Sequence, residues 1–107
     1  MTATSKTAGT ATLINHSTGK QVSHSFSGQP SLCQENAEWI VEDFEEGGGL
    51  VPLSNFGTVT FTGASAGTSS GTVTPSGATI IDMEQNGRVL TSVSASGSSV
   101  TVEYTGP

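Results

Sequence analysis

The stretch Asn36-Ala37-Glu38-Trp39-Ile40-Val41-Glu42-Asp43-Phe44 contains the only Trp of the chain, and most of the negative charge lies in or beside it. Apolar and β-branched residues are crowded here without helical spacing, and three consecutive glycines follow at positions 47–49. This pattern favours a β-strand over a helix. We therefore predict a strand that runs through the middle of a sheet.

Side chains on a strand alternate between its two faces. Trp39 and Val41 are expected to share the face that packs into the core, where solvent hardly reaches them. The acidic Glu38 and Glu42 share the opposite face with Ile40. Glu42 is expected to open onto a concave surface, so this half-polar face is the place to look for function.

The composition indicates an all-β protein. The chain has 107 residues with 14 Gly, many Ser and Thr, and three Lys and Arg in total. Such a composition favours short strands joined by tight turns, and the length suits one small sandwich domain of about seven or eight strands. The predicted fold is an antiparallel β-sandwich of the concanavalin or jelly-roll kind. Helix is expected in less than about a tenth of the residues.

The charge is strongly acidic, with three basic residues against nine acidic ones, six of them within residues 35–46. Nucleic acid and anionic membranes are therefore not expected as partners. In strong acid the carboxylates lose their charge, and only the three Lys and Arg side chains and two His side chains remain positive. Self-repulsion then stays small, which suits a protein that works in acid.

No metal site or cofactor is expected. Cys33 is the only cysteine, so it cannot form a disulfide within the chain, and no spacing fits a zinc site. His16 and His24 are not directly opposite each other in the predicted hairpin, so a metal pair is not expected. Neither end has an apolar stretch long enough for a signal peptide or a membrane span. A secretion signal would have to lie upstream.

The first predicted unit is a hairpin of strands 10–15 and 20–26 with a turn at residues 16–19. Gly19 supplies the positive φ that such a turn needs. The alternation of apolar residues marks the expected inward positions, which are Leu13, Val22, His24 and Phe26.

The second half of the chain is predicted to be a series of short strands. Residues 63–71 are small and polar, which indicates a loop. The Asn86-Gly87 pair is a strong hairpin signal. The predicted strands cover residues 56–62, 72–74, 78–84, 88–93 and 99–104.

The carboxylates of the central stretch do not form a catalytic pair by themselves. Along a strand, the Cα atoms of Glu38 and Glu42 are roughly 13 Å apart. Glycosidases place their two carboxyl groups about 5–9.5 Å apart, and aspartic proteases place theirs closer still. A single Glu can nevertheless activate a water molecule if another group stabilises the oxyanion. Without further information, a solvated surface Glu is the alternative interpretation.

The ten residues Ala37-Glu38-Trp39-Ile40-Val41-Glu42-Asp43-Phe44-Glu45-Glu46, with the segments at 50–53 and 56–61, resemble the glutamic peptidases, also called eqolisins. The resemblance implies a β-sandwich endopeptidase that acts in acid and is secreted. The second Glu of the family's pattern is its catalytic carboxylate, which corresponds to Glu42. The resemblance implies that Glu42 is the general base for water, while a Gln amide stabilises the tetrahedral intermediate. Glu38 is a candidate for substrate binding, or an exposed acid.

The resemblance covers nearly the whole chain but only about the second half of the family's chain. The family's catalytic Gln, most of its substrate-binding residues and the disulfide partner implied for Cys33 lie in the other half. The four Gln residues of this chain stand in contexts that do not match the catalytic one; they are Gln21, Gln29, Gln34 and Gln85. Residues 1–107 are thus a single domain or a half-domain: a fragment, one chain of a processed enzyme, or a truncated relative that cleaves nothing.

Two functions are carried forward from the sequence. The first is a glutamic endopeptidase with protein or peptide substrates, whose present chain contributes the Glu but not the Gln. The alternative is a non-catalytic β-sandwich module with a binding or structural role. If half of a sandwich is missing, strand edges and an apolar face stay uncovered. We then expect either a homodimer or a complementary chain that supplies the missing half.

Overall fold

The computed structural model describes residues 1–43 and 45–106. Its described residues contain strands, turns and extended segments but no helix, and every strand pair is antiparallel. The all-β prediction is therefore confirmed. The chain divides into two compact units, Met1–Asn36 and Ala37–Pro107, which are described separately. No helix of the described residues is long and apolar enough to cross a membrane.

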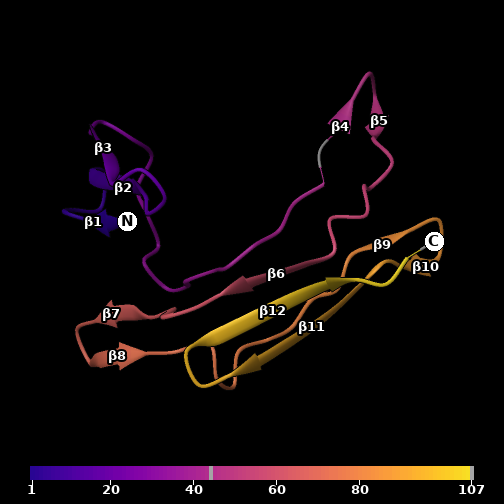
Figure 1. The fold of residues 1–107 in the computed structure, drawn as a ribbon. Helices are drawn as coiled ribbons and strands as arrows, with labels where there is room; N and C mark the ends of the chain where they lie inside the picture. The colour runs from indigo at the N-terminus through magenta and orange to yellow at the C-terminus, as the bar shows by residue number, and fades with distance from the viewer. Residues whose placement is uncertain (44, 107) are drawn as a thin grey trace. The chain divides into compact units, whose positions relative to one another are not determined.

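The first unit is a three-stranded sheet in the order β1-β2-β3 (Figure 1). Its strands are β1 (Thr2–Ala3), β2 (Gly9–Asn15) and β3 (Lys20–Phe26). The predicted hairpin is confirmed, including the positive φ of 74° at Gly19. The Gly19 amide donates a hydrogen bond to the Asn15 carbonyl oxygen at 2.7 Å, which closes the turn.

The two faces of this sheet differ in chemistry. On one face, cross-strand hydroxyl groups hydrogen-bond each other: the Thr12 and Ser23 oxygens are 2.8 Å apart, and Thr10 and Ser25 form a second pair at 3.4 Å. The opposite face is apolar because Leu13 lies across from Val22 and Gly9 from Phe26. The register thus places the predicted inward residues together on one face.

Most of that apolar face is nevertheless exposed. Leu13 is 74% exposed and Val22 is 65% exposed, and His24 is exposed as well. Of the four predicted inward residues, only Phe26 is half-buried, because its ring lies over Gly9. The prediction that Leu13, Val22 and His24 lie inside is wrong for this unit, since a single sheet of three strands has no second layer to cover them.

The predicted central strand at residues 36–44 is not formed. The structure assigns no strand to residues 27–43, and Phe44 lies outside the described residues. Exposure alternates as expected, with Trp39 and Val41 half-buried and Ile40 54% exposed. The expectations of a mid-sheet position and of inaccessible Trp39 and Val41 are wrong. The physical reason is that a strand needs a neighbour for its backbone groups, and no described strand pairs with residues 36–42.

The core of the second unit is a three-stranded sheet in the order β11-β12-β6. Its strands are β6 (Thr58–Phe61), β11 (Thr91–Ser96) and β12 (Ser99–Tyr104), which run side by side in Figure 1. Val100 and Val102 are buried on one face of β12, as the alternation of this last strand predicts. Tyr104 continues that face and contacts Phe56 edge to face, with ring centroids 6.0 Å apart.

Three small hairpins complete the second unit. They are β4 (Glu45–Glu46) with β5 (Gly49–Leu50), β7 (Ala66–Thr68) with β8 (Gly71–Val73), and β9 (Glu84–Gln85) with β10 (Arg88–Val89).

The last of these hairpins confirms the predicted turn, and both its central residues have positive φ, 55° at Asn86 and 75° at Gly87.

The predicted loop at residues 63–71 is partly wrong, because residues 66–68 pair with 71–73. There the Thr68 hydroxyl donates a hydrogen bond to the Gly71 carbonyl oxygen at 2.7 Å. The predicted strand at residues 78–84 is also wrong, since only its last residue belongs to a strand. Ile81 in this segment is 83% exposed.

Candidate functional site

An open depression of about 380 Å³ in the second unit contains Glu42. It brings together two parts of the chain that are far apart in the sequence: the end of the extended stretch, and the β9–β10 hairpin with the residues directly before and after it. The lining residues are Val41, Glu42, Asp43, Met83, Glu84, Gln85 and Leu90.

One wall of the depression is fixed by a buried threonine. Thr91, the first residue of β11, is only 3% exposed. Its hydroxyl oxygen accepts a hydrogen bond from the Met83 amide at 2.9 Å, and the hydroxyl donates to Asp82 Oδ1 at 3.2 Å. Thr91 therefore ties the residues that lead into β9 to the central sheet.

Backbone hydrogen bonds and a buried Leu hold the same wall. The Leu90 amide donates to the Met83 carbonyl oxygen at 2.8 Å, and the Leu90 carbonyl oxygen accepts from the amides of Thr105 and Gly106. The Leu90 side chain is buried, and a Cβ on Gly106 would come within 2.6 Å of it. A non-glycine residue does not fit there without displacing Leu90, so this end of the chain closes tightly over it.

Glu42 is exposed at this depression, while Val41 and Asp43 beside it are half-buried. An exposed carboxylate next to a concave surface can contact both a water molecule and a bound chain, which is the geometry that a general base requires. Its role as the catalytic residue remains a prediction from the sequence.

Glu38 is exposed and does not line the depression. The structure therefore does not bring Glu38 together with Glu42 at this surface, although both are exposed and share one side of the extended stretch. Its role in substrate binding remains a prediction. Cys33 is exposed and carries a free thiol.

Gln85 is the glutamine that the described lining of the depression contains. Its side-chain amide donates a hydrogen bond to the Val51 carbonyl oxygen at 3.4 Å. Two of the other glutamines use their amides within the first unit, Gln29 toward the Ser27 carbonyl oxygen and Gln34 toward that of Ser5. An amide nitrogen has two N–H groups, so Gln85 keeps one for another partner.

Glu84 was not predicted from the sequence as a residue of this site. Glu84 lines the same depression as Glu42, although 41 positions separate them in the sequence. The available signal was its place two residues before the Asn86-Gly87 pair, which puts Glu84 and Gln85 on the first strand of a tight hairpin. Nothing in the local pattern indicates which distant segment this hairpin meets.

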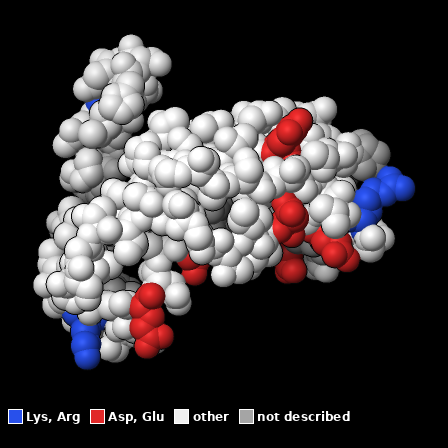
Figure 2. All heavy atoms as spheres, turned by 90° about the horizontal axis from the view of Figure 1, so that it is seen from below, with Lys and Arg blue, Asp and Glu red and all other residues white. Residues whose placement is uncertain are grey.

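Metal ligands do not gather in the described part of the chain: residues 1–43 and 45–106 contain no group of three or more His, Cys, Asp or Glu placed to hold an ion. His16 lies in the β2–β3 turn, and His24 lies opposite Ala11. Figure 2 shows the few Lys and Arg side chains and the acidic ones on the molecular surface.

The antiparallel sheets and the absence of helix from the described residues define an all-β protein. A model of the Peptidase A4 family matches residues 1–104, and the chain belongs to that family. It is 57% identical over 104 residues to aspergillopepsin-2 from Aspergillus niger, covering 95% of this chain and 37% of that protein. It is 41% identical over 113 residues to scytalidopepsin B from Scytalidium lignicola, covering 97% of this chain and 44% of that protein.

Solved structures give the same result. The crystal structure of aspergilloglutamic peptidase from Aspergillus niger aligns with a TM-score of 0.88 at 57% identity, covering 95% of this chain and 61% of that one. Scytalido-glutamic peptidase with a transition state analogue inhibitor aligns with a TM-score of 0.80 at 38% identity, covering 95% and 54%. The predicted resemblance to the glutamic peptidases is confirmed. The chain spans less than half of the length of both named relatives.

The Thr91 anchor leads to a prediction about stability. Replacing Thr91 with the isosteric Val removes both hydroxyl hydrogen bonds and leaves the Met83 amide without its partner. Unfolding in urea should therefore require less denaturant, with a loss of about 1–3 kcal/mol in the free energy of unfolding. The control is Thr60→Val on β6, where the residue is exposed and the change should stay within about 0.5 kcal/mol. Equal urea midpoints for the two variants would contradict the stabilising role of the Thr91 hydrogen bonds.

Proposed function

We propose that this chain is the Glu-bearing portion of an acid-acting glutamic endopeptidase, with Glu42 as general base. The observation that carries the proposal is the exposed Glu42 at the depression of a chain that belongs to the Peptidase A4 family. Named relatives of the chain are peptidases, and their matching portion includes the residues around this position.

The chemistry follows from what one carboxylate can do. The Glu42 carboxylate accepts a proton from a water molecule as the water oxygen attacks the carbonyl carbon of a peptide bond. The protonated Glu42 then gives the proton to the leaving amine. A carboxylate base remains ionised in moderate acid, where a His or Lys side chain would be protonated and unable to act as a base.

The tetrahedral intermediate needs a hydrogen-bond donor for its oxyanion. Gln85 is at the depression, but its amide is directed to the Val51 carbonyl oxygen. We therefore assign the donor to a Gln outside this chain, in the portion that the named relatives have and that this chain does not span. In this proposal the chain alone binds a protein or peptide substrate weakly and cleaves it little.

An extracellular, acidic location is part of the same proposal. Nine acidic residues and only three Lys and Arg leave the protein weakly charged in acid, so charge repulsion does little to unfold it there. Protein or peptide substrates are proposed, whereas nucleic acid and anionic membranes are not expected to bind an acidic surface.

The alternative is a non-catalytic binding or structural module. The observation in its favour is the exposed hydroxyl face of the β2–β3 hairpin, with its cross-strand pairs Thr10–Ser25 and Thr12–Ser23. Such a flat polar face could bind a protein or polysaccharide. It requires neither Glu42 nor a Gln donor, so the two functions are separable by mutation.

The proposal includes a partner for this chain, either a second copy or a complementary chain with the missing strands. Leu13 and Val22 are exposed on the face of the first unit, and Ile40 and Ile81 are exposed in the second. Residues 37–43 belong to no sheet among the described residues. Exposed apolar side chains and extended backbone outside a sheet both favour association.

Glu42→Gln should abolish proteolysis in acid. The experiment uses this chain together with the N-terminal portion of a related glutamic peptidase, a denatured protein substrate and pepstatin to suppress aspartic proteases. Removing the base should lower kcat by roughly 10²- to 10⁴-fold. Glu35→Gln is the matched control, because it removes an exposed carboxylate that does not line the depression and has no proposed role in the site; its kcat should be unchanged. Full activity of Glu42→Gln would overturn the proposed function.

The association state gives an independent prediction. At micromolar concentration the chain alone should sediment as a dimer or larger species, and adding the complementary N-terminal portion should convert it to a one-to-one complex. The reason is the burial of the exposed apolar side chains and the pairing of residues 37–43. A stable compact monomer that does not bind the added N-terminal portion would favour the non-catalytic module.

A further inference from the structure

One short motif is not used by the proposed catalytic function. Asn15-His16-Ser17 fits the acceptor pattern for N-linked glycosylation, Asn-X-Ser or Asn-X-Thr, with His rather than Pro in the middle. None of the other three Asn residues of the chain is followed by Ser or Thr two positions later. A chance match is common for so short a motif, so the structural setting decides its value.

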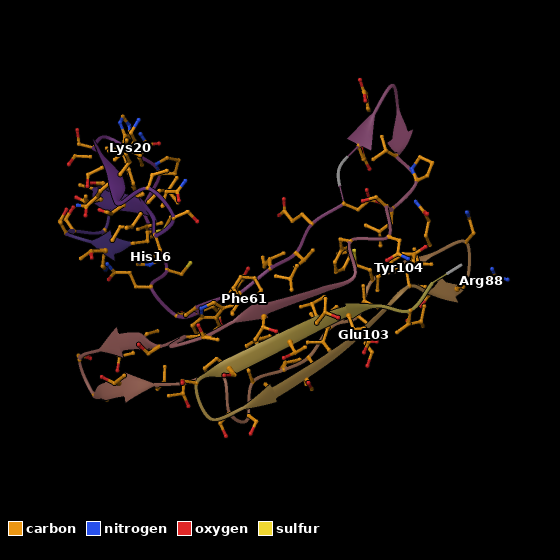
Figure 3. All side chains as sticks on the ribbon, in the orientation of Figure 1. His16, Lys20, Phe61, Arg88, Glu103 and Tyr104 are labelled. Atoms are coloured by element: carbon orange, nitrogen blue, oxygen red, sulfur yellow. The ribbon has the colours of Figure 1, made fainter. Side chains whose placement is uncertain are left out.

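The motif lies at the tip of the β2–β3 hairpin, which His16 and Lys20 mark in Figure 3. Asn15 is the last residue of β2 and pairs with Lys20, and all residues from Asn15 to Lys20 are exposed. The turn is closed by the backbone bond from the Gly19 amide to the Asn15 carbonyl oxygen at 2.7 Å. A group attached to the Asn15 side chain therefore leaves the closing bond intact.

The Asn15 side chain is oriented by one of its two polar atoms. Its Oδ1 accepts a hydrogen bond from the Ser17 amide at 3.0 Å. Its Nδ2, the atom to which a glycan is joined, makes no hydrogen bond with the residues that the structure describes. The atom that would carry the glycan, Nδ2, thus lies on an exposed turn. The hydrogen bond between Asn15 Oδ1 and the Ser17 amide helps to hold the conformation of that turn.

We propose that Asn15 carries an N-linked glycan when the chain passes through a eukaryotic secretory pathway. This inference rests on the extracellular location in the proposed function, but not on catalysis. The donor is a lipid-linked oligosaccharide pyrophosphate. Asn15 Nδ2 attacks the first sugar carbon, the bond from that carbon to the pyrophosphate oxygen breaks, and the lipid pyrophosphate leaves. Nδ2 gives up one proton in the same exchange.

A glycan at Asn15 would also limit the apolar face of the first unit. Asn15 and Leu13 are two positions apart on β2, so their side chains share one face, roughly 7 Å apart along the strand. Leu13 and Val22 lie opposite each other on that face, and Lys20 lies opposite Asn15. A partner that covers Leu13 and Val22 must therefore end before the hairpin tip, where the glycan and Lys20 remain in solvent.

The test is direct mass measurement of one peptide. The full chain is produced behind a secretory leader in a yeast host, and both the medium and the cell-associated pool are analysed, because transfer precedes export. Trypsin cleavage after Lys6 and Lys20 yields residues 7–20, a peptide with a single Asn. The peptide should carry a hexose-rich glycan, and peptide-N-glycosidase should release it and leave Asp at position 15.

Four variants separate the site from its surroundings. Asn15→Gln and Ser17→Ala should both lose the glycan completely, Ser17→Thr should keep it, and Asn36→Gln should leave it unchanged. An unmodified peptide 7–20 in both pools, with Ser17→Thr equally unmodified, would overturn the proposal. Since the readout is a mass, a glycosylated chain that stays inactive with the complementary N-terminal portion contradicts only the peptidase proposal, and an unmodified chain that cleaves with that portion contradicts only this one.

Discussion

A β-strand is held by hydrogen bonds to a neighbouring strand, and residues 37–42 have no neighbouring strand among the described residues. Their sequence has the composition of a buried strand, and their exposure alternates as it does on a strand. These residues are therefore extended but outside any sheet. Because Glu42 is one of them, the position of the candidate base depends on strands that the described part of this chain does not supply.

The opposite wall of the depression, which the β9–β10 hairpin forms, does not depend on pairing of the segment that carries Glu42. Thr91 and Leu90 fasten the β9–β10 hairpin to the central sheet through short hydrogen bonds, and the small core of Val100 and Val102 lies in the same sheet. The second unit thus has a fixed wall, which includes Glu84 and Gln85, and a segment outside any sheet that carries Glu42. In the proposed enzyme, a complementary portion would both pair this segment and supply the oxyanion donor.

Local signals predicted the parts of the fold that pair locally. The hairpin of β2 and β3, the Asn86-Gly87 turn and strand β12 follow from turn residues and alternation, because their partners are close in the sequence. Residues 37–43 and 78–83 have the composition of strands, yet the structure assigns none of them to a strand, and no local pattern reveals this. Strand β8 was predicted, but its partner β7 was missed because the small residues of β7 give no alternation. Glu42 was predicted through a family resemblance. Glu84 was not predicted, because its place at the depression depends on a long-range contact.

Amide hydrogen exchange of residues 37–42 tests the central claim most directly. It is measured by mass spectrometry on the chain alone and again after addition of the N-terminal portion of a related glutamic peptidase, with β12 as the internal reference. Extended backbone outside a sheet should exchange quickly in the chain alone and become protected in the complex, while β12 stays protected in both. Strong protection of residues 37–42 in the isolated monomer would contradict the account, because it would show that this chain pairs these residues by itself.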